Sequence, residues 1–516
     1  MSGNKRGVFQ TGEELQATIS SETSDEKGRF NRRDFVQPLI DYCLRNCFNA
    51  GVGIVFGIRA TGKTVGMLQA AQQLIADGHT VAYARFNYND TGMDVVTDEI
   101  YSLADKGITC FFVDEASYLN GFMSLVAEWA DRIVPGRKVK IVISGTDSFL
   151  LWLTREDALF HRFEQFSTNY MTYSEYKRVV GKSFENYKHH GGLFESGNVE
   201  SFLRQSIVDN LIHTLDHCFD GILRRNVYTD LLYGLSPAVI YKAVISILKS
   251  TAEDSIRRMF IRDAHQRTIA DLGTAVSGWS KQNKDDIKKR IADEMSIYDD
   301  FRGIKHPGEV IDALIGFLLN IGCLTEFKSS LTGIASTQSN YYFTQNALMS
   351  YAVNETIDAL GKIGSIQQRV FEQSIEQAAE GAMNETIVAT HILHSVKPDE
   401  KAFKYRDLQG REIDCVVLNR ENGYARLIEV KSAVAVNPNA VFSADARHLY
   451  DAELLENLGL DKSFKVMRIL VYKGRTRRLK RREDDLVLAN IEEFISNCAD
   501  ISNFASAVIP EPVQTG

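Results

Sequence analysis

Residues 57–64 read Gly-Ile-Arg-Ala-Thr-Gly-Lys-Thr, and this spacing constrains the fold more than any other feature of the chain. Gly57 and Gly62 let the backbone curl so that successive N–H groups converge on one anion. Lys63 adds a point charge for phosphate oxygens, and the Thr64 hydroxyl is placed to coordinate Mg²⁺. A loop of this kind binds phosphate where it joins the end of a buried strand to the N-terminus of a helix. An apolar run at 52–56 and a helix-favouring run at 65–76 supply both, so we predict a phosphate-binding loop formed by Gly57, Arg59, Ala60, Thr61, Gly62, Lys63 and Thr64.

A second apolar run, 110–113, ends at Asp114 and Glu115. The C-terminal ends of parallel strands meet at one edge of a sheet, so these acids should lie beside the loop. Asp114 is then placed to hold the water shell of Mg²⁺, and Glu115 to polarise the attacking water. The alternative is that the pair only caps the next helix. The two motifs together predict binding and hydrolysis of ATP with Mg²⁺.

Three other side chains are candidates for the same site. Ser144 follows the apolar run 141–143, where its hydroxyl could sense the γ-phosphate or could belong to an ordinary turn. Arg162 is a candidate arginine finger, acting across a subunit interface of a homo-oligomer or on its own site, or else a surface arginine. Arg59 could contact phosphate or brace the loop.

The chain has 516 residues, which is too long for a single hydrophobic core. Strand-like and helical runs alternate from residue 52 to 171, which predicts an α/β domain with a mostly parallel sheet. A helix at 310–319 followed by strand-like runs at 323–328 and 341–344 fits a winged helix or a plain packing module. We therefore expect a flexible arm at 1–30, a P-loop domain at 31–180, a helical and winged-helix connector at 181–355, and a smaller α/β domain at 356–516.

A second group of charged residues lies near the C-terminus. Residues 413–416 read Ile-Asp-Cys-Val and residues 427–431 read Leu-Ile-Glu-Val-Lys. Strand alternation places Glu429 and Lys431 on one face, and a neighbouring strand would bring Asp414 beside them. Two carboxylates holding Mg²⁺ or Mn²⁺ beside one lysine can cleave phosphodiesters. A cross-strand salt bridge is the alternative.

This pattern resembles the PD-(D/E)-x-K nuclease fold, in which the preceding helix contributes a further acid. Glu372, with Glu376 one turn later as its substitute, fits that place. The resemblance implies a metal-dependent nuclease domain with Asp414, Glu429 and Lys431 as site residues.

The N-terminal motifs, with Ser-Gly-Thr at 144–146 and Gly-Gly-Leu at 191–193, resemble prokaryotic AAA+ ATPases that carry such a C-terminal nuclease-like domain. The resemblance covers most of residues 35–475. It implies an AAA-type fold, ATP hydrolysis with Mg²⁺ and a winged-helix connector. The segment 194–305 is longer than the family pattern, so its role is left open.

Residues 475–482 form the densest basic run of a chain whose net charge is −8. Backbone phosphates of DNA are the expected partners, and a solvated loop is the alternative. The basic side chains concerned are Arg475, Arg477, Arg478, Lys480, Arg481 and Arg482.

The chain shows neither a signal peptide nor an apolar run long enough for a membrane span, and its seven cysteines form no C-x-x-C pair, so we expect a cytoplasmic protein. The combined prediction is an ATPase coupled to a metal-dependent DNA nuclease, acting in DNA processing or genome defence. The alternative is a nucleotide-driven switch whose C-terminal domain binds a protein or DNA partner without cleaving it.

Overall fold

The computed structural model describes most of the chain outside residues 195–234 and 264–306. The described residues are 7–25, 28–48, 51–87, 93–119, 121–145, 162–194, 235–263, 307–331, 337–361, 368–407, 411–438, 440–442, 445–481 and 484–512, together with Leu151, Leu159, Leu211 and Leu232. Within these ranges no side chain is described at 25, 28–29, 93–94, 237, 253–263, 307, 330–331, 337–338, 355–361, 368–375, 484, 502 and 510–512.

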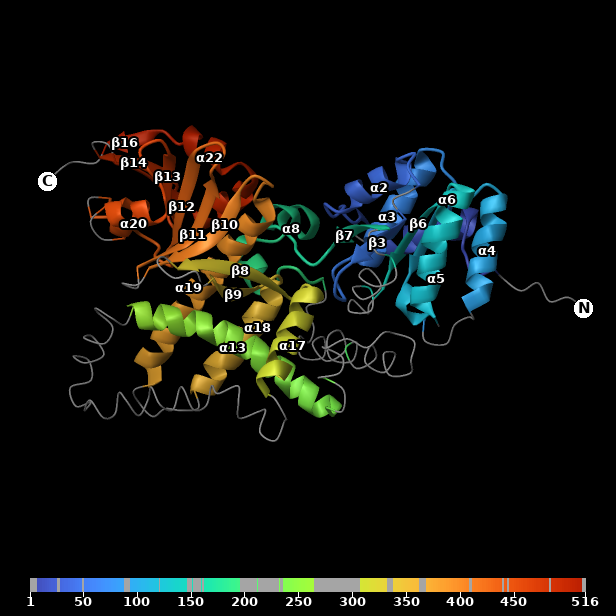
Figure 1. Ribbon diagram of the computed structural model, residues 1–516, viewed down its shortest axis with the longest axis horizontal. Coiled ribbons are helices and arrows are strands. Elements are labelled where there is room, and N and C mark those ends of the chain that lie inside the picture. Colours follow the sequence, from blue (N-terminus) through green and yellow to red (C-terminus); the bar gives the residue numbers. More distant parts are fainter. Residues whose placement is uncertain are drawn as a thin grey trace, which may run out of the picture.

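A five-stranded parallel sheet forms the N-terminal lobe, drawn in blue to green at one end of Figure 1. Its strand order is β4 (Val81–Arg85), β5 (Cys110–Asp114), β6 (Lys140–Ser144), β3 (Val52–Phe56) and β7 (Phe163–Ser167). β3, β5 and β6 are buried along their whole length, as expected for strands covered on both faces. Because β6 lies between β3 and β5, the C-terminal ends of these three strands meet at one edge.

Helices cover both faces of this sheet. One face carries α1 (Gly12–Glu22), α2 (Val36–Leu44) and α3 (Lys63–Ala76); the other carries α4 (Met93–Asp105), α5 (Phe122–Glu128), η2 (Trp129–Ile133) and α6 (Val134–Arg137). The short elements β1 (Ser24–Asp25), β2 (Gly28–Arg29) and η1 (Ala116–Tyr118) complete the lobe. The flexible arm expected at 1–30 contains α1, because Leu15 and Ile19, one helical turn apart, are buried in the core with α3.

The opposite lobe is built on a nine-stranded sheet. Its order is β16 (Pro510–Pro512), β14 (Arg477–Arg481), β15 (Asp484–Asn490), β13 (Lys465–Tyr472), β12 (Tyr424–Val430), β11 (Glu412–Asn419), β10 (Lys401–Arg406), β8 (Leu324–Leu331) and β9 (Thr337–Phe343). One face packs on α19 (Gln368–Ser395), α21 (Ile491–Ser496), η7 (Cys498–Asp500) and α22 (Ile501–Ala507), and the other packs on η6 (Arg447–Tyr450) and α20 (Ala452–Asn457).

The connector consists of α13 (Pro237–Asp263), α17 (Pro307–Asn320) and α18 (Asn346–Gly361), which lie with α19 below the large sheet in Figure 1. α17 precedes the β8–β9 hairpin, in the order expected for a winged helix. The hairpin, however, continues the C-terminal sheet, because β8 pairs in parallel with β10. The expected boundary at residue 355 therefore does not separate two sheets.

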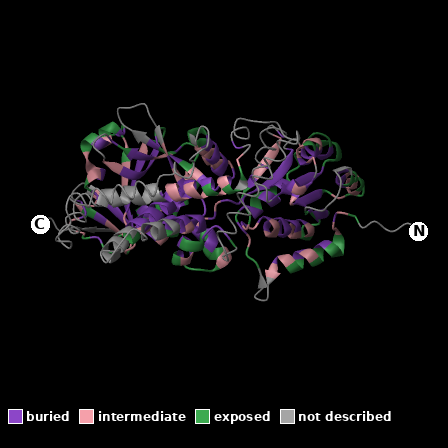
Figure 2. Cartoon of the chain, turned by 90° about the horizontal axis from the view of Figure 1, so that it is seen from below, coloured by how far each residue is buried: buried purple, intermediate pink, exposed green. Residues whose placement is uncertain are grey.

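The two lobes share buried cores. One core runs from Ile143 of β6 to Leu314 of α17 and Met349 of α18. α8 (Tyr173–Val180) and α9 (Phe184–His190) follow β7 in the chain but pack in the core of the C-terminal sheet. Buried residues accordingly run through both sheets in Figure 2, and exposed ones gather on the outer helices. No helix in the described part of the chain is long and apolar enough to cross a membrane.

Candidate functional site

The loop between β3 and α3 has the backbone that its glycines permit. Gly62 has a φ of 84°, in the left-handed region that favours glycine, and immediately precedes α3. At Gly57 a Cβ would lie 2.0 Å from Thr168 Oγ1, so a side chain has no room there. Ala60 adopts a φ of 62° without being glycine. Strain of this kind persists only where the surroundings hold the loop in shape.

Lys63 is buried within this loop. Its Nζ donates to the carbonyl oxygens of Gly57, at 2.7 Å, and Ile58, at 2.9 Å. Burial lowers the pKa of Lys63 to about 8, although Glu115 and Asp114 oppose that shift. The ammonium is thus centred over the loop, where phosphate oxygens would attract it more strongly than neutral carbonyls do. Thr64 is half-buried at the start of α3, whereas Arg59 is exposed.

Asp114 ends β5 in a completely buried position, where it accepts hydrogen bonds from three groups and pairs with Arg85 at 4.0 Å. Tyr83 Oη donates to its Oδ2 at 3.0 Å, the Ser144 hydroxyl donates to its Oδ1, and the Glu115 N–H donates to the same oxygen. Glu115 has a φ of 55°, so the backbone turns sharply at the proposed water-activating residue. Asp114, Glu115 and Ser144 therefore lie at the expected edge of the sheet.

Tyr83 was not predicted from the sequence. The available signal was a tyrosine within the otherwise apolar residues 81–84 of β4, which pairs with β5. Its hydroxyl fixes the carboxylate that we expect to hold the water shell of Mg²⁺.

Arg162 does not reach the phosphate loop of its own chain. It precedes β7, and its carbonyl accepts from the N–H of Val52 at the start of β3. The loop lies at the other end of β3, about 16 Å away at the rise of a strand. Arg162 forms an ion pair with Asp131. The hypothesis that it acts on its own site fails for this reason, and action across a subunit interface stays a prediction.

A buried arginine braces the loop from behind. Arg33 donates to the carbonyl oxygens of Thr61 and Thr168, at 2.6 and 2.9 Å, and pairs with Glu175 at 2.8 Å. The side chains of Arg33 and Glu175 are only 5% and 4% exposed. The two residues are 142 positions apart, so no local pattern could have paired them.

The carboxylates predicted for the second site are buried in the C-terminal sheet. Asp414 Oδ2 accepts from the N–H of Val430 at 2.8 Å. Glu429 accepts from Lys431 Nζ at 2.8 Å and pairs with His448 Nε2 at 3.2 Å. Asp414 and Glu429 are 1% and 2% exposed. Among the residues that the structure describes, no group of three or more His, Cys, Asp or Glu side chains is arranged to hold a metal ion.

A lysine that belongs to neither of the sequence motifs lies beside Asp414. Lys404 Nζ is 2.6 Å from Glu385, 3.3 Å from Glu412 and 3.8 Å from Asp414. Burial alone would lower the pKa of Lys404, but Glu385 and the other acids raise it well above its usual value. The acid that α19 contributes to this cluster is therefore Glu385. The side chain of Glu372 lies outside the described residues, and Glu376 is exposed.

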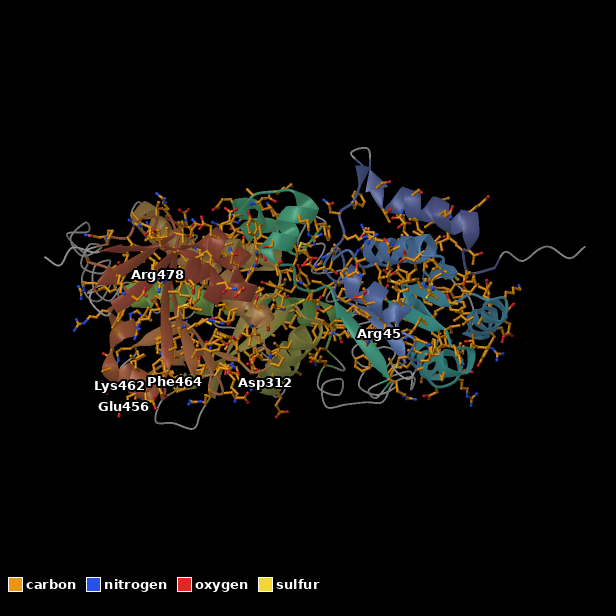
Figure 3. All side chains as sticks on the ribbon, turned by 90° about the horizontal axis from the view of Figure 1, so that it is seen from above. Arg45, Asp312, Glu456, Lys462, Phe464 and Arg478 are labelled. Carbon is orange, nitrogen blue, oxygen red and sulfur yellow. The ribbon has the colours of Figure 1, made fainter. Side chains whose placement is uncertain are left out.

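The basic run does not form a loop. Residues 477–481 are β14, an internal strand between β15 and β16. Arg478 forms a bidentate pair with Asp485, and Arg481 lies over the ring of Phe442. Alternation sends neighbouring side chains to opposite faces, so the charges are divided between two surfaces. Of the remaining members, Arg475 and Lys480 are exposed, Arg477 is half-buried, and Arg482 lies outside the described residues. Figure 3 labels Arg478 in the C-terminal lobe, far from Arg45 in the N-terminal lobe.

The five-stranded parallel sheet and the loop of the N-terminal lobe fit an AAA-type P-loop domain. Residues 49–177 match the family model of the AAA domain, which indicates nucleotide-dependent ATPase activity. Residues 380–490 match a model described as a domain of unknown function, DUF4143.

The solved structure of PCH-2 from C. elegans is similar at 16% identity, with a TM-score of 0.21. The match covers 44% of this chain and 60% of that one, which is less than two thirds of its length. No curated protein matches the chain.

Proposed function

We propose that the protein is an ATP-hydrolysing molecular switch, in which the nucleotide state of the loop is transmitted to a C-terminal domain that does not cleave DNA. Lys63 and the loop N–H groups would hold the phosphates, Thr64 and Asp114 would hold Mg²⁺ and its water shell, and Glu115 would orient the attacking water. Bound Mg²⁺ would neutralise charge that develops on the phosphates.

The observation that carries the proposal is a segment, residues 168–173, which contacts the phosphate loop at one end and the C-terminal lobe at the other. At its first end, Thr168 Oγ1 lies 2.6 Å from Thr61 Oγ1. Asn169 Oδ1 accepts from the N–H of Ile58 at 2.9 Å. The side-chain amide of Asn169 also donates to the carbonyl of Ile321, directly after α17, at 2.9 Å.

The other end of segment 168–173 is tied to α19 and α21. The ring of Tyr170 stacks on His394, with centroids 3.6 Å apart. The N–H of Tyr173 donates to His391 Nε2 at 3.0 Å, and its hydroxyl donates to Glu492 at 2.6 Å. A shift of the loop on binding phosphates would therefore move groups that hold the C-terminal lobe.

Two observations favour a non-cleaving domain over a nuclease. Asp414 and Glu429 are closed off from solvent, whereas a catalytic metal needs open positions for water and substrate. The basic run supplies no single phosphate-binding face, because β14 divides its side chains between two surfaces.

Amide hydrogen exchange tests the switch. In Glu115→Gln protein, ATP with Mg²⁺ should slow exchange in residues 168–173 and 387–395 by about fivefold or more, which corresponds to a coupling of about 1 kcal/mol. Lys63→Ala protein serves as the control and should show no change. Unchanged exchange in both segments, in protein that binds ATP, would refute transmission.

A cleavage panel tests the other half of the proposal. Wild-type protein with Mg²⁺ or Mn²⁺, with and without ATP, should cut single-stranded, duplex and branched DNA no faster than Asp414→Ala protein does. Cleavage that Asp414→Ala abolishes would instead establish the nuclease and overturn the non-cleaving assignment.

The contact between segment 168–173 and α19 should make the stability of the protein depend on pH. Burial lowers the pKa of His391 to about 4, and its Nε2 accepts the Tyr173 N–H only while the ring is neutral. The unfolded histidine titrates near 6.5, so the unfolded state binds more protons below that pH, and stability present above 6.5 is lost as pH falls towards 4. Between pH 7 and 5 this amounts to about 2 kcal/mol.

Urea unfolding at the two pH values measures the effect. His391→Asn, which accepts a hydrogen bond but does not titrate, should lose about 2 kcal/mol less than wild-type protein on acidification. His190→Asn, at an exposed site on α9, is the control and should follow wild-type. Equal losses in wild-type and His391→Asn would contradict the assignment.

A further inference from the structure

The cluster around Lys404 arises from an irregularity in the sheet. The register of β10 against β11 shifts between Phe403 and Tyr405, so that Lys404 faces both Asp414 and Cys415. The side chain of Lys404 is 5% exposed and points towards Glu385 of α19. Four charged side chains from three separate elements therefore meet in the interior.

Their charges need a cation. Three carboxylates this close repel one another in a medium of low dielectric constant, and each loses its hydration on burial. Carboxylate oxygens are also the ligands that Mg²⁺ and Mn²⁺ prefer. The Lys404 ammonium lies between the three carboxylates, with the nearest oxygen 2.6 Å away and the farthest of the three 3.8 Å away.

Two of these carboxylates also accept hydrogen bonds from other groups of the protein. Tyr342 Oη donates to Glu385 at 3.0 Å, and the Val430 N–H donates to Asp414. These bonds hold the two carboxylates in place, and because a carboxylate has about four lone-pair sites they do not by themselves exclude a cation. The predicted catalytic lysine, Lys431, pairs with Glu429.

We propose that Lys404 is the built-in cation of this cluster and takes the place of a divalent metal. With Lys404 between them the acids are not arranged to hold a metal ion, and its removal lets Glu385, Glu412 and Asp414 close around Mg²⁺ or Mn²⁺. The inference accounts for the non-cleaving half of the proposed function. It does not depend on the ATP switch, and its test uses neither ATP nor DNA.

The test compares Mn²⁺ binding by metal-stripped full-length proteins, measured by calorimetry and by thermal unfolding. Lys404→Met keeps the length and apolar stem of the side chain but removes the charge. It should unfold at a lower temperature than wild-type without metal, and 1 mM Mn²⁺ should raise its midpoint by about 5 °C or more. Wild-type and Lys404→Arg, which both keep the charge, should not respond to Mn²⁺.

The double variant Lys404→Met, Asp414→Asn is the matched control, and it should lose the response to Mn²⁺. A folded Lys404→Met that binds no Mn²⁺ would overturn the proposal. So would stoichiometric Mn²⁺ binding by wild-type protein that Asp414→Asn abolishes, and this second measurement decides the matter even if Lys404→Met does not fold.

Discussion

Lys63→Ala should lose ATP turnover by about 100-fold or more, because the loop N–H groups alone cannot offset the charge that builds up on the β- and γ-phosphates. The Lys63 ammonium is already placed over the loop by the carbonyls of Gly57 and Ile58. Glu115→Gln should bind ATP as wild-type does but hydrolyse it far more slowly, since only the orientation of water is lost. Steady-state phosphate release and binding of a fluorescent nucleotide analogue measure the two effects.

The matched control for Lys63→Ala is Lys106→Ala. Lys106 is an exposed lysine of the same lobe and does not belong to the phosphate loop at 57–64. It should retain wild-type turnover. If Glu115→Gln hydrolyses ATP at the wild-type rate, Glu115 does not orient the water. If Lys63→Ala hydrolyses ATP normally, the loop is not the catalytic site.

Arg33→Met should destabilise the protein by about 3–5 kcal/mol, because it leaves Glu175 buried without its charge partner. The substitution also removes the donors that hold the carbonyls of Thr61 and Thr168. ATP affinity should therefore fall together with stability. Urea unfolding and nucleotide titration measure the two losses.

Arg45→Met is the control for Arg33→Met. Arg45, labelled in Figure 3, pairs with Glu164, but its side chain is 51% exposed, so solvent screening leaves the pair worth less than about 1 kcal/mol. A stability loss for Arg33→Met as small as that of the control would show that Arg33 does not brace the loop.

The phosphate loop could be predicted because its chemistry is local. Gly57, Gly62, Lys63 and Thr64 lie within eight residues, and the flanking strand and helix follow from the apolar runs beside them. The position of Asp114 followed from one further rule, that parallel strands present their C-terminal ends at one edge. These residues lie where the sequence predicted them, together with the parallel sheet that carries them.

The C-terminal site could not be predicted in the same way. The motif residues Asp414, Glu429 and Lys431 identified a pair of strands, and β11 and β12 are indeed adjacent. The motif could not reveal the register shift between β10 and β11 that brings Lys404 between Glu385 and Asp414. The sequence of the basic run at 475–482 likewise does not show whether it forms a loop or an internal strand.

Features that depend on neighbours along the chain could be predicted from the sequence: the loop, the ends of the strands and the α/β class of the N-terminal lobe. Which charges are paired, and which segments connect the lobes, depends on tertiary packing. Arg33 meets Glu175 across 142 residues and Tyr173 meets His391 across 218. A buried polar or charged group must be paired, and the group that lies next to it is determined by how distant segments of the chain pack together.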